Sequence, residues 1–174
     1  MKKEDSARNR KYPTWGNYPG VNLKFLLEFM KYLGVTAEDY GKMGATSAQA
    51  LRLQLRNDDM KVSKAKEIVR TLGYKLEIEL LEKEVKEDTE ETYAVILPKE
   101  KVPTAYKSYR LKNIPFLDEW MEKRRLSQRK MGELLNCSSG AVESWIKTDD
   151  MPISYVNKMK EALNLRVKYE ITKE

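Results

Sequence analysis

Residues 148–154 read TDDMPIS, and residues 57–63 read NDDMKVS, the same heptapeptide in outline. Sliding the chain against itself by 91 positions places residues 22–80 on residues 113–171 without a gap. Fourteen aligned positions are then identical, whereas composition alone would give about four. The chain is therefore one module of about 60 residues written twice, an internal repeat.

Each copy of the repeat predicts four helices followed by one strand. In the second copy, apolar residues within 116–121 recur at the three- and four-residue spacing of an amphipathic helix. Val167, Tyr169 and Ile171 later alternate with charged residues, as in a half-buried strand. The helices between them are expected to open at Ser127, at Ser138 and at the Pro152–Ser154 stretch.

The first copy follows the same plan. Its elements are a helix over 22–33, helices from Thr36, Ser47 and Ser63, and a strand at 75–80. Because a lone strand cannot satisfy its backbone, we expect the strands of the two copies to pair. Residues 91–97, ETYAVIL, also have strand composition, so the connector before them could turn a hairpin. The predicted fold class is mainly α: two tandem modules of four to five helices, each followed by a β-strand, with a small shared antiparallel sheet.

The charge distribution divides the chain into four segments. The net charge is +6: residues 1–21 carry +3, residues 81–91 carry −4 and residues 99–112 carry +4. A basic segment therefore precedes each module. The segments are a basic aromatic arm at 1–21, a first module with its strand at 22–81, an acidic linker with a strand and a second basic arm at 82–112, and a second module with its strand at 113–174.

The residue types present argue against several functional classes. The chain has no histidine and one cysteine, Cys137, which weighs against imidazole or thiolate metal sites and against triad chemistry. Its eight glycines are scattered and form no phosphate-cradling loop. Asp58 and Asp59 fall at a turn between helices, where we expect solvated caps rather than acid/base groups. We therefore expect no enzymatic activity, no metal and no cofactor.

The hydropathy of the chain argues against a membrane partner. No stretch approaches the roughly 18 apolar residues of a membrane span. The charged N-terminal residues contain no apolar signal-peptide core. We expect a cytoplasmic protein.

The stretch LSQRKMGELLNCSSGAVESWIKTDDMP, residues 126–152, resembles the helix-turn-helix domains of the lambda repressor and Cro family. Gln128 opens the second helix, where that family usually has a glutamine that contacts phosphate. Gly132 occupies the mid-helix position that must be small because two helices cross there, and Pro152 falls where the family often has a proline. The apolar positions that hold the second helix against the third are Met131, Leu135, Cys137, Val142 and Trp145.

The first copy departs from this pattern and inherits the resemblance through the gapless repeat. Its turn position is Ala45, where the second copy has Asn136, a residue that tolerates a positive φ. Because alanine at a positive φ is strained, we expect the first turn to be built differently. Ala37 stands in place of the phosphate-contacting glutamine. The apolar positions of this copy read Tyr40, Gly44, Thr46, Leu51 and Gln54.

The resemblance implies that the third helix of each copy lies in the major groove of DNA. Gln49 can pair with adenine through its amide and Arg52 with guanine through its guanidinium, whereas Glu143 accepts from cytosine but repels phosphate. The first copy thus has the better reading face, and the second has the better scaffold. The implied DNA-binding residues are Gln49, Arg52 and Arg56 in the first copy and Gln128, Ser138, Ser139, Glu143, Ser144 and Lys147 in the second.

The basic segment before each copy supports two interpretations. KYPTWGNYPGVN, 11–22, matches KVPTAYKSYRLKN, 101–113, after a one-residue insertion. In the first interpretation these arms run along DNA, as basic arms beside recognition helices do. In the second, the aromatic residues Trp15, Tyr18, Tyr106 and Tyr109 pack over their own module as a lid. The DNA-contacting residues of the arms would be Arg8, Arg10 and Lys11, and Lys107, Arg110 and Lys112.

These observations predict a DNA-binding protein, a transcriptional regulator in which two helix-turn-helix modules form an internal pseudo-dimer on double-stranded DNA. The alternative is a protein-interaction module of the same fold, antitoxin-like or a phage accessory protein, that does not bind DNA. Third helices buried against each other or against the sheet would exclude the first interpretation. The sequence leaves open a further homodimer or protein partner, the target site and any effector.

Overall fold

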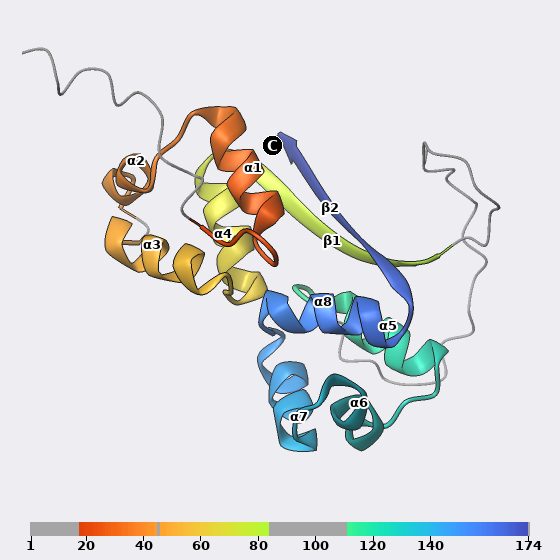
Figure 1. Cartoon of the computed structure of the whole chain (residues 1–174). Helices are drawn as coiled ribbons and strands as arrows, with labels where there is room; N and C mark the ends of the chain where they lie inside the picture. Colours follow the sequence, from red (N-terminus) through yellow and green to blue (C-terminus); the bar gives the residue numbers. More distant parts are fainter. Residues whose placement is uncertain (1–17, 45, 84–110, 174) are drawn as a thin grey trace, which may run out of the picture.

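The computed structural model describes residues 18–44, 46–83 and 111–173, which form eight helices and two strands (Figure 1). The chain is mainly helical with a small two-stranded antiparallel sheet, which confirms that part of the predicted fold class. The strand predicted at 91–97 lies outside the described residues. In order, the elements are α1 (Lys24–Leu33), α2 (Ala37–Lys42), α3 (Ala48–Asn57), α4 (Val62–Thr71), β1 (Tyr74–Glu82), α5 (Pro115–Lys123), α6 (Gln128–Leu135), α7 (Ser139–Thr148), α8 (Ile153–Ala162) and β2 (Leu165–Lys173).

The second and third helices of each half begin at the predicted hydroxyl caps. Thr36 Oγ1 accepts from the Asp39 amide at 3.0 Å, and the Asp39 carboxylate accepts in return from the Thr36 amide. This pair of hydrogen bonds is a capping box, and it satisfies amides that the first turn of the helix leaves unpaired. The remaining caps are Ser47, Ser127 and Ser138, whose hydroxyls accept from the amides of Ala50, Lys130 and Ala141 at 3.1 Å.

The fourth helices begin at or close to the predicted positions. α4 starts at Val62, one residue before the predicted Ser63, and α8 starts at Ile153, within the predicted Pro152–Ser154 stretch. Neither helix has a side-chain cap from its N-cap residue. The two serines instead use their amides and hydroxyls for contacts with the other half of the chain.

The first aspartate of each repeated heptapeptide ties its own half together. Asp58 ends α3 in the left-handed conformation, with φ 53°, and its carboxylate accepts from the amides of residues 21–23 at 2.8–3.1 Å. Asp149 ends α7 at φ 50° and accepts from the amides of residues 112–114. The expectation of a solvated cap was wrong for Asp58, which is only 7% exposed. The carboxylate is buried because it closes the start of the half over the end of the third helix.

The second aspartate ties the two halves to each other. Asp59 accepts from the Ser154 amide at 3.0 Å and from the Ser154 hydroxyl at 2.6 Å. Asp150 makes the same two contacts with Ser63, at 3.0 and 2.6 Å. Between them, the Val62 amide donates to the Met151 carbonyl and the Ile153 amide to the Met60 carbonyl, both at 2.9 Å. The repeated heptapeptide is therefore the junction of the molecule.

The pairing of residues 91 positions apart reveals a pseudo-two-fold axis. β1 and β2 pair antiparallel with Ile78 opposite Tyr169, and Lys61 forms an isolated antiparallel bridge with Pro152. Both pairs join a residue to its own repeat equivalent, which requires that each pair lies on the axis that relates the halves. The axis therefore runs from the middle of the sheet to the loops that follow α3 and α7.

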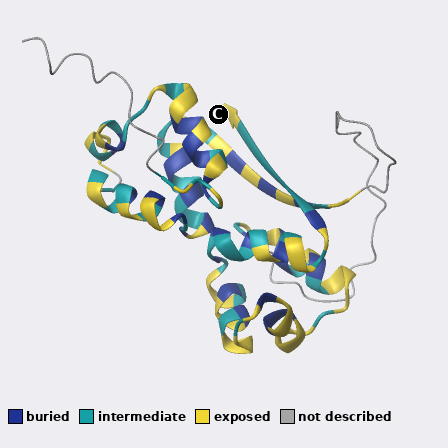
Figure 2. Cartoon of the chain, in the orientation of Figure 1, coloured by how far each residue is buried: buried dark blue, intermediate teal, exposed yellow. Residues whose placement is uncertain are grey.

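Each half also packs on the strand of the other. Trp120 of α5 donates its indole N–H to the Leu80 carbonyl of β1 at 3.0 Å, and Phe25 of α1 stacks on Tyr169 of β2 with ring centroids 4.0 Å apart. Burial raises the pKa of the Tyr169 hydroxyl, which donates to Asn157. The buried hydrophobic residues belong to one core cluster, and Figure 2 shows that buried residues occur in the helices of both halves and in the sheet. The two halves share one hydrophobic core.

None of the helices in the described ranges combines the length and the apolar character needed to cross a bilayer.

Replacing Asp150 by alanine tests the junction. Loss of two hydrogen bonds to a charged acceptor leaves the Ser63 amide and hydroxyl unpaired, so we expect the free energy of unfolding to fall by about 1.5–3 kcal/mol. In a double-mutant cycle in urea, Asp150→Ala and Ser63→Ala should couple by about 1 kcal/mol. Exposed Glu28→Ala serves as the control and should cost about 0.5 kcal/mol or less. Additive effects in the cycle would contradict the cross-half contact.

Candidate nucleic-acid interface

The α6–α7 pair is held by a close approach at a glycine. A Cβ on Gly132 would lie 2.8 Å from the Cys137 carbonyl oxygen and 3.2 Å from the Ser139 amide nitrogen. Only glycine therefore lets α6 meet the start of α7 at this distance. Asn136 turns the chain between the helices at φ 54°, the conformation expected from the sequence. The predicted apolar contacts are confirmed, with Met131, Leu135, Val142 and Trp145 buried and Cys137 half-buried.

The α2–α3 pair achieves the same approach with a different turn. A Cβ on Gly41 would lie 2.9 Å from the Ala48 amide nitrogen. α2 has 6 residues where α6 has 8, and Gly44 takes the positive φ, 83°. The turn is thus built differently, as predicted, while Ala45 lies outside the described residues. Tyr40 and Leu51 are fully buried.

The core of the α2–α3 pair contains polar atoms. The Tyr40 hydroxyl and the Gln54 Oε1 are buried and hydrogen-bond to no atom of the described residues. Their equivalents in the other half are Met131 and Trp145, which are apolar and buried. Unpaired buried polar atoms cost free energy, so the first half has the poorer core that its sequence indicated.

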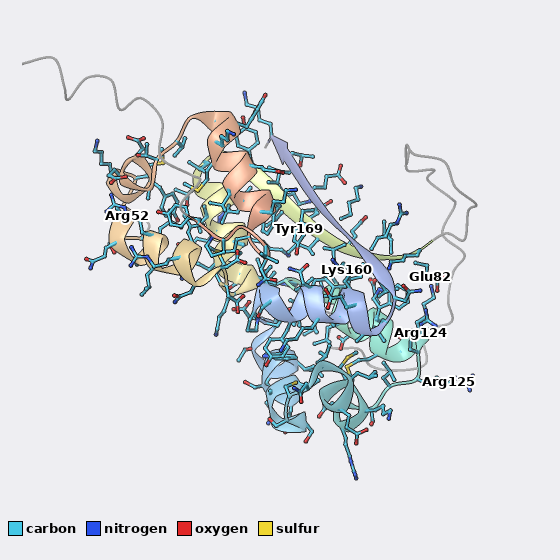
Figure 3. The ribbon with its side chains drawn as sticks, in the orientation of Figure 1. Arg52, Glu82, Arg124, Arg125, Lys160 and Tyr169 are labelled. Carbon is cyan, nitrogen blue, oxygen red and sulfur yellow. The ribbon has the colours of Figure 1, made fainter. Side chains whose placement is uncertain are left out.

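The predicted residues of α3 lie on its outer surface. Gln49 and Arg56 are exposed, and Arg56 forms no ion pair with a described residue. Arg52 is half-buried and forms an ion pair with Glu38 of α2 (Figure 3). Two of the three side chains are thus free to meet a partner, and the third must first leave a carboxylate.

The predicted residues of the other half are also at the surface. Glu143 and Lys147 pair with each other at 2.7 Å, and this contact lowers the pKa of the Glu143 carboxyl. The Ser138 hydroxyl is occupied as a helix cap, so it has less freedom to bind elsewhere. The remaining residues, Gln128, Ser139 and Ser144, are exposed.

α3 and α7 lie on the side of the molecule opposite the sheet. Figure 1 shows α2–α3 at the left and α6–α7 at the bottom, with α4 and α8 between them and the strands at the upper right. The strands contact α4, α8 and α5. The third helices are therefore not covered by the sheet, which was the arrangement that would have excluded groove binding.

The basic arms are described only in part. Arg8, Arg10, Lys11, Lys107 and Arg110 lie outside the described residues, as do the aromatic residues Trp15, Tyr106 and Tyr109. Lys112 has an exposed side chain, and its backbone bonds to Asp149 and Lys66. Tyr18 is half-buried and packs against the core. The lid interpretation therefore applies to Tyr18, and the DNA interpretation of the arms remains a prediction.

Sequence reasoning missed two features of the surface. Met43 and Leu53 are 51% and 55% exposed, large apolar side chains on the α2–α3 pair. Arg125 projects outward between α5 and α6 at φ 51° (Figure 3). The basic run that contains it was visible in the sequence, but only as the end of a helix.

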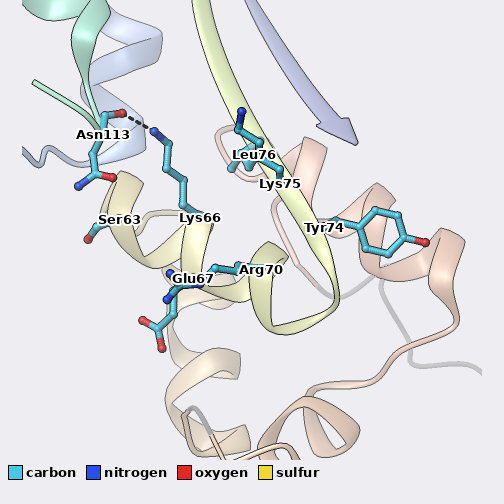
Figure 4. A pocket seen from close by; sticks show the side chains of 8 residues that line it. All are labelled: Ser63, Lys66, Glu67, Arg70, Tyr74, Lys75, Leu76 and Asn113. Carbon is cyan, nitrogen blue, oxygen red and sulfur yellow. Dashed lines mark hydrogen bonds between the residues drawn. The ribbon is translucent and has the colours of Figure 1, made fainter. Parts of the chain in front are cut away.

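A groove of about 310 Å³ lies between α4, β1 and Asn113 (Figure 4). Burial lowers the pKa of Lys66, whose ammonium group donates to the Asn113 carbonyl at 2.9 Å across the junction. Lys75 pairs with Glu77, and Glu67 pairs with Lys64. Three of the charged side chains that line the groove are thus engaged with other groups of the protein.

Comparison of the chain with protein-family models, with curated proteins and with solved structures finds no match. Within the described ranges, no three His, Cys, Asp or Glu side chains form a group that could hold a metal ion.

Two glycines on α6 and α7 should respond to alanine in opposite directions. Gly132→Ala forces a Cβ against backbone atoms, so we expect it to lower the free energy of unfolding by about 1–3 kcal/mol. Gly140 meets nothing closer than 3.8 Å, so Gly140→Ala should raise it by up to about 1 kcal/mol through helix propensity. Urea denaturation of both variants gives the test. A neutral Gly132→Ala would contradict the close crossing.

Proposed function

We propose that α2–α3 and α6–α7 are two helix-turn-helix modules and that the chain binds double-stranded DNA as a transcriptional regulator. The observation that carries the proposal is the exposure of both third helices on the side opposite the sheet, at the end of one pseudo-two-fold axis. Duplex DNA has local two-fold axes perpendicular to its length. A protein with matching symmetry brings the same helix to two successive faces of the major groove.

In dimers of the lambda repressor and Cro family, each of two chains presents one recognition helix to DNA. In this proposal a single chain presents both. Asp59 and Asp150 fix one half against the other, and the paired strands extend that contact. The relative placement of the two modules is thus set by folding rather than by protein concentration. Because the halves differ in sequence, the expected target is an imperfect palindrome.

The first two turns of the third helices carry side chains that can contact base edges. Gln49 is exposed near the start of α3 and can pair bidentately with adenine. Arg52 can do so with guanine once Glu38 releases it. In α7, Ser139 and Ser144 offer short hydroxyls, which discriminate bases weakly. Arg56 and Lys147, at the far ends of these helices, suit phosphate contacts.

A protein-interaction module is the second candidate, and Met43 and Leu53 favour it. Both are more than half exposed, and Leu53 directly follows Arg52, whose charge Glu38 neutralises. Exposed apolar side chains at one helix pair are a feature of protein-binding surfaces. A thymine methyl group could also meet Leu53, so the residue fits either partner.

Binding to duplex DNA across a salt series separates the two candidates. We expect the affinity for a random duplex to fall with added salt, with a slope of about −0.9 per phosphate contacted. Arg56→Gln and Lys147→Gln should each reduce the slope by up to about one unit. Exposed Lys24→Gln, on α1, is the matched control and should leave it unchanged. Absence of DNA binding, combined with capture of a protein partner that Leu53→Ser abolishes, would favour the second candidate.

A further inference from the structure

The two halves carry their positive charge on different surfaces. The second half has five cations around the turn from α5 to α6, which we name the α5–α6 corner. At the repeat-equivalent positions of the first half there is no cation and there are two carboxylates. The α5–α6 corner consists of Lys123, Arg124, Arg125, Arg129 and Lys130, and its equivalents are Tyr32, Leu33, Gly34, Glu38 and Asp39.

The α5–α6 corner keeps unneutralised charge. Glu82 at the end of β1 pairs with Lys123 at 3.0 Å and approaches Arg124 at 3.9 Å. Glu133 is shared by Arg129 and Lys130, at 3.3 and 3.1 Å. Each carboxylate thus serves two cations. Arg125 pairs with no described acidic residue and projects outward (Figure 3).

The equivalent corner of the first half lacks the positive charge that would attract a polyanion. Asp39 accepts hydrogen bonds from the amide and hydroxyl of Thr36, and these bonds lower the pKa of its carboxyl. Glu38, one residue before it, pairs with Arg52, and Asp39 itself approaches Lys42 at 3.9 Å. Because these carboxylates take up the neighbouring cations, the start of α2 has no unpaired positive charge among its described residues to attract a phosphate.

The third helices show the reverse asymmetry. α3 carries Gln49, Arg52 and Arg56 and no acidic residue before Asp58. α7 carries Glu143, paired with Lys147, and small residues in its first turn. The side chains that can discriminate base edges are therefore concentrated on the half with the weaker hold on phosphate.

We infer that the two modules divide the work of DNA binding: the second half grips the phosphate backbone through the α5–α6 corner, and the first half reads bases through α3. The inference rests on the proposed function and specifies its target. The preferred duplex is asymmetric, with base identity specified under α3 and tolerated under α7. The junction links the two activities: when the second half is bound to the phosphate backbone of DNA, it holds α3 of the first half at a high local concentration near the bases.

Paired charge removals on the full chain test this division. Arg125→Gln with Arg129→Gln should weaken binding to random and to selected duplex by the same factor, about tenfold at low salt, and flatten the salt slope by up to about two units. The matched control is Lys31→Gln with Lys42→Gln, which removes the same charge from exposed positions flanking the first-half corner. The control should change binding less than twofold.

Base discrimination should depend on α3 alone. Gln49→Ala should weaken binding to a selected duplex by about fivefold or more while leaving random duplex unchanged. Ser139→Ala with Ser144→Ala should change neither. Of the substituted residues, Arg125 alone has a positive φ, and the others have ordinary backbone conformations. The thermal midpoint of each variant therefore serves as a check that it is folded.

Three results would overturn the inference. One is equal weakening by the corner pair and by its first-half control, since net charge alone would then explain the effect. Another is loss of discrimination in the α7 serine pair as large as that in Gln49→Ala. If no duplex is bound at any salt concentration, the proposed function itself fails, and the division of labour fails with it.

Discussion

Two consecutive aspartates at the end of the third helix constrain this molecule in both halves. Asp58 and Asp149 take the left-handed conformation that stops the helix, and their carboxylates close the start of the same half. That turn sends the next carboxylate, on Asp59 or Asp150, across to a serine of the other half. Hydrogen bonds to a charged acceptor are among the stronger polar contacts in proteins. The heptapeptide is repeated because each copy completes the other.

The orientation of the remaining elements follows from this reciprocal contact. Once Lys61 lies beside Pro152 and Ile78 beside Tyr169, the direction of the pseudo-two-fold axis is set. The strands must then pair antiparallel on one side, and α3 and α7 must lie around the other end of the axis. The proposed DNA binding uses that consequence: folding, rather than dimerisation, would set the spacing of the two reading helices. Divergence between the copies is then free to give each half a different role.

Local structure was predictable where single residues have strong preferences. The helix starts at Ser47, Ser127 and Ser138 and the left-handed turn at Asn136 follow from capping and φ preferences that act over three or four residues. The pairing of the two strands followed from their need for a partner. What could not be predicted were contacts over long sequence separations. Asp59 looked like a solvated cap because its partner, Ser154, is 95 positions away.

The exposure of the candidate DNA-binding residues on α3 and α7 was predictable, but their ion pairs were not. The outward residues of α3 and α7 were identified from the repeat and the resemblance, and all of them in the described ranges are exposed or half-exposed. The ion pair between Arg52 and Glu38 was not, because it depends on how α2 crosses α3. The most direct test of the molecular junction is native-state amide exchange at Val62, Ser63, Ile153 and Ser154, four amides of the repeated heptapeptides that donate between halves. We expect all four amides to exchange only through global unfolding, with the same free energy of opening as the core amides of both halves. Exchange of these amides with a lower free energy of opening, while the core amides of either half stay protected, would contradict the claim that the aspartates join the halves into one cooperative unit.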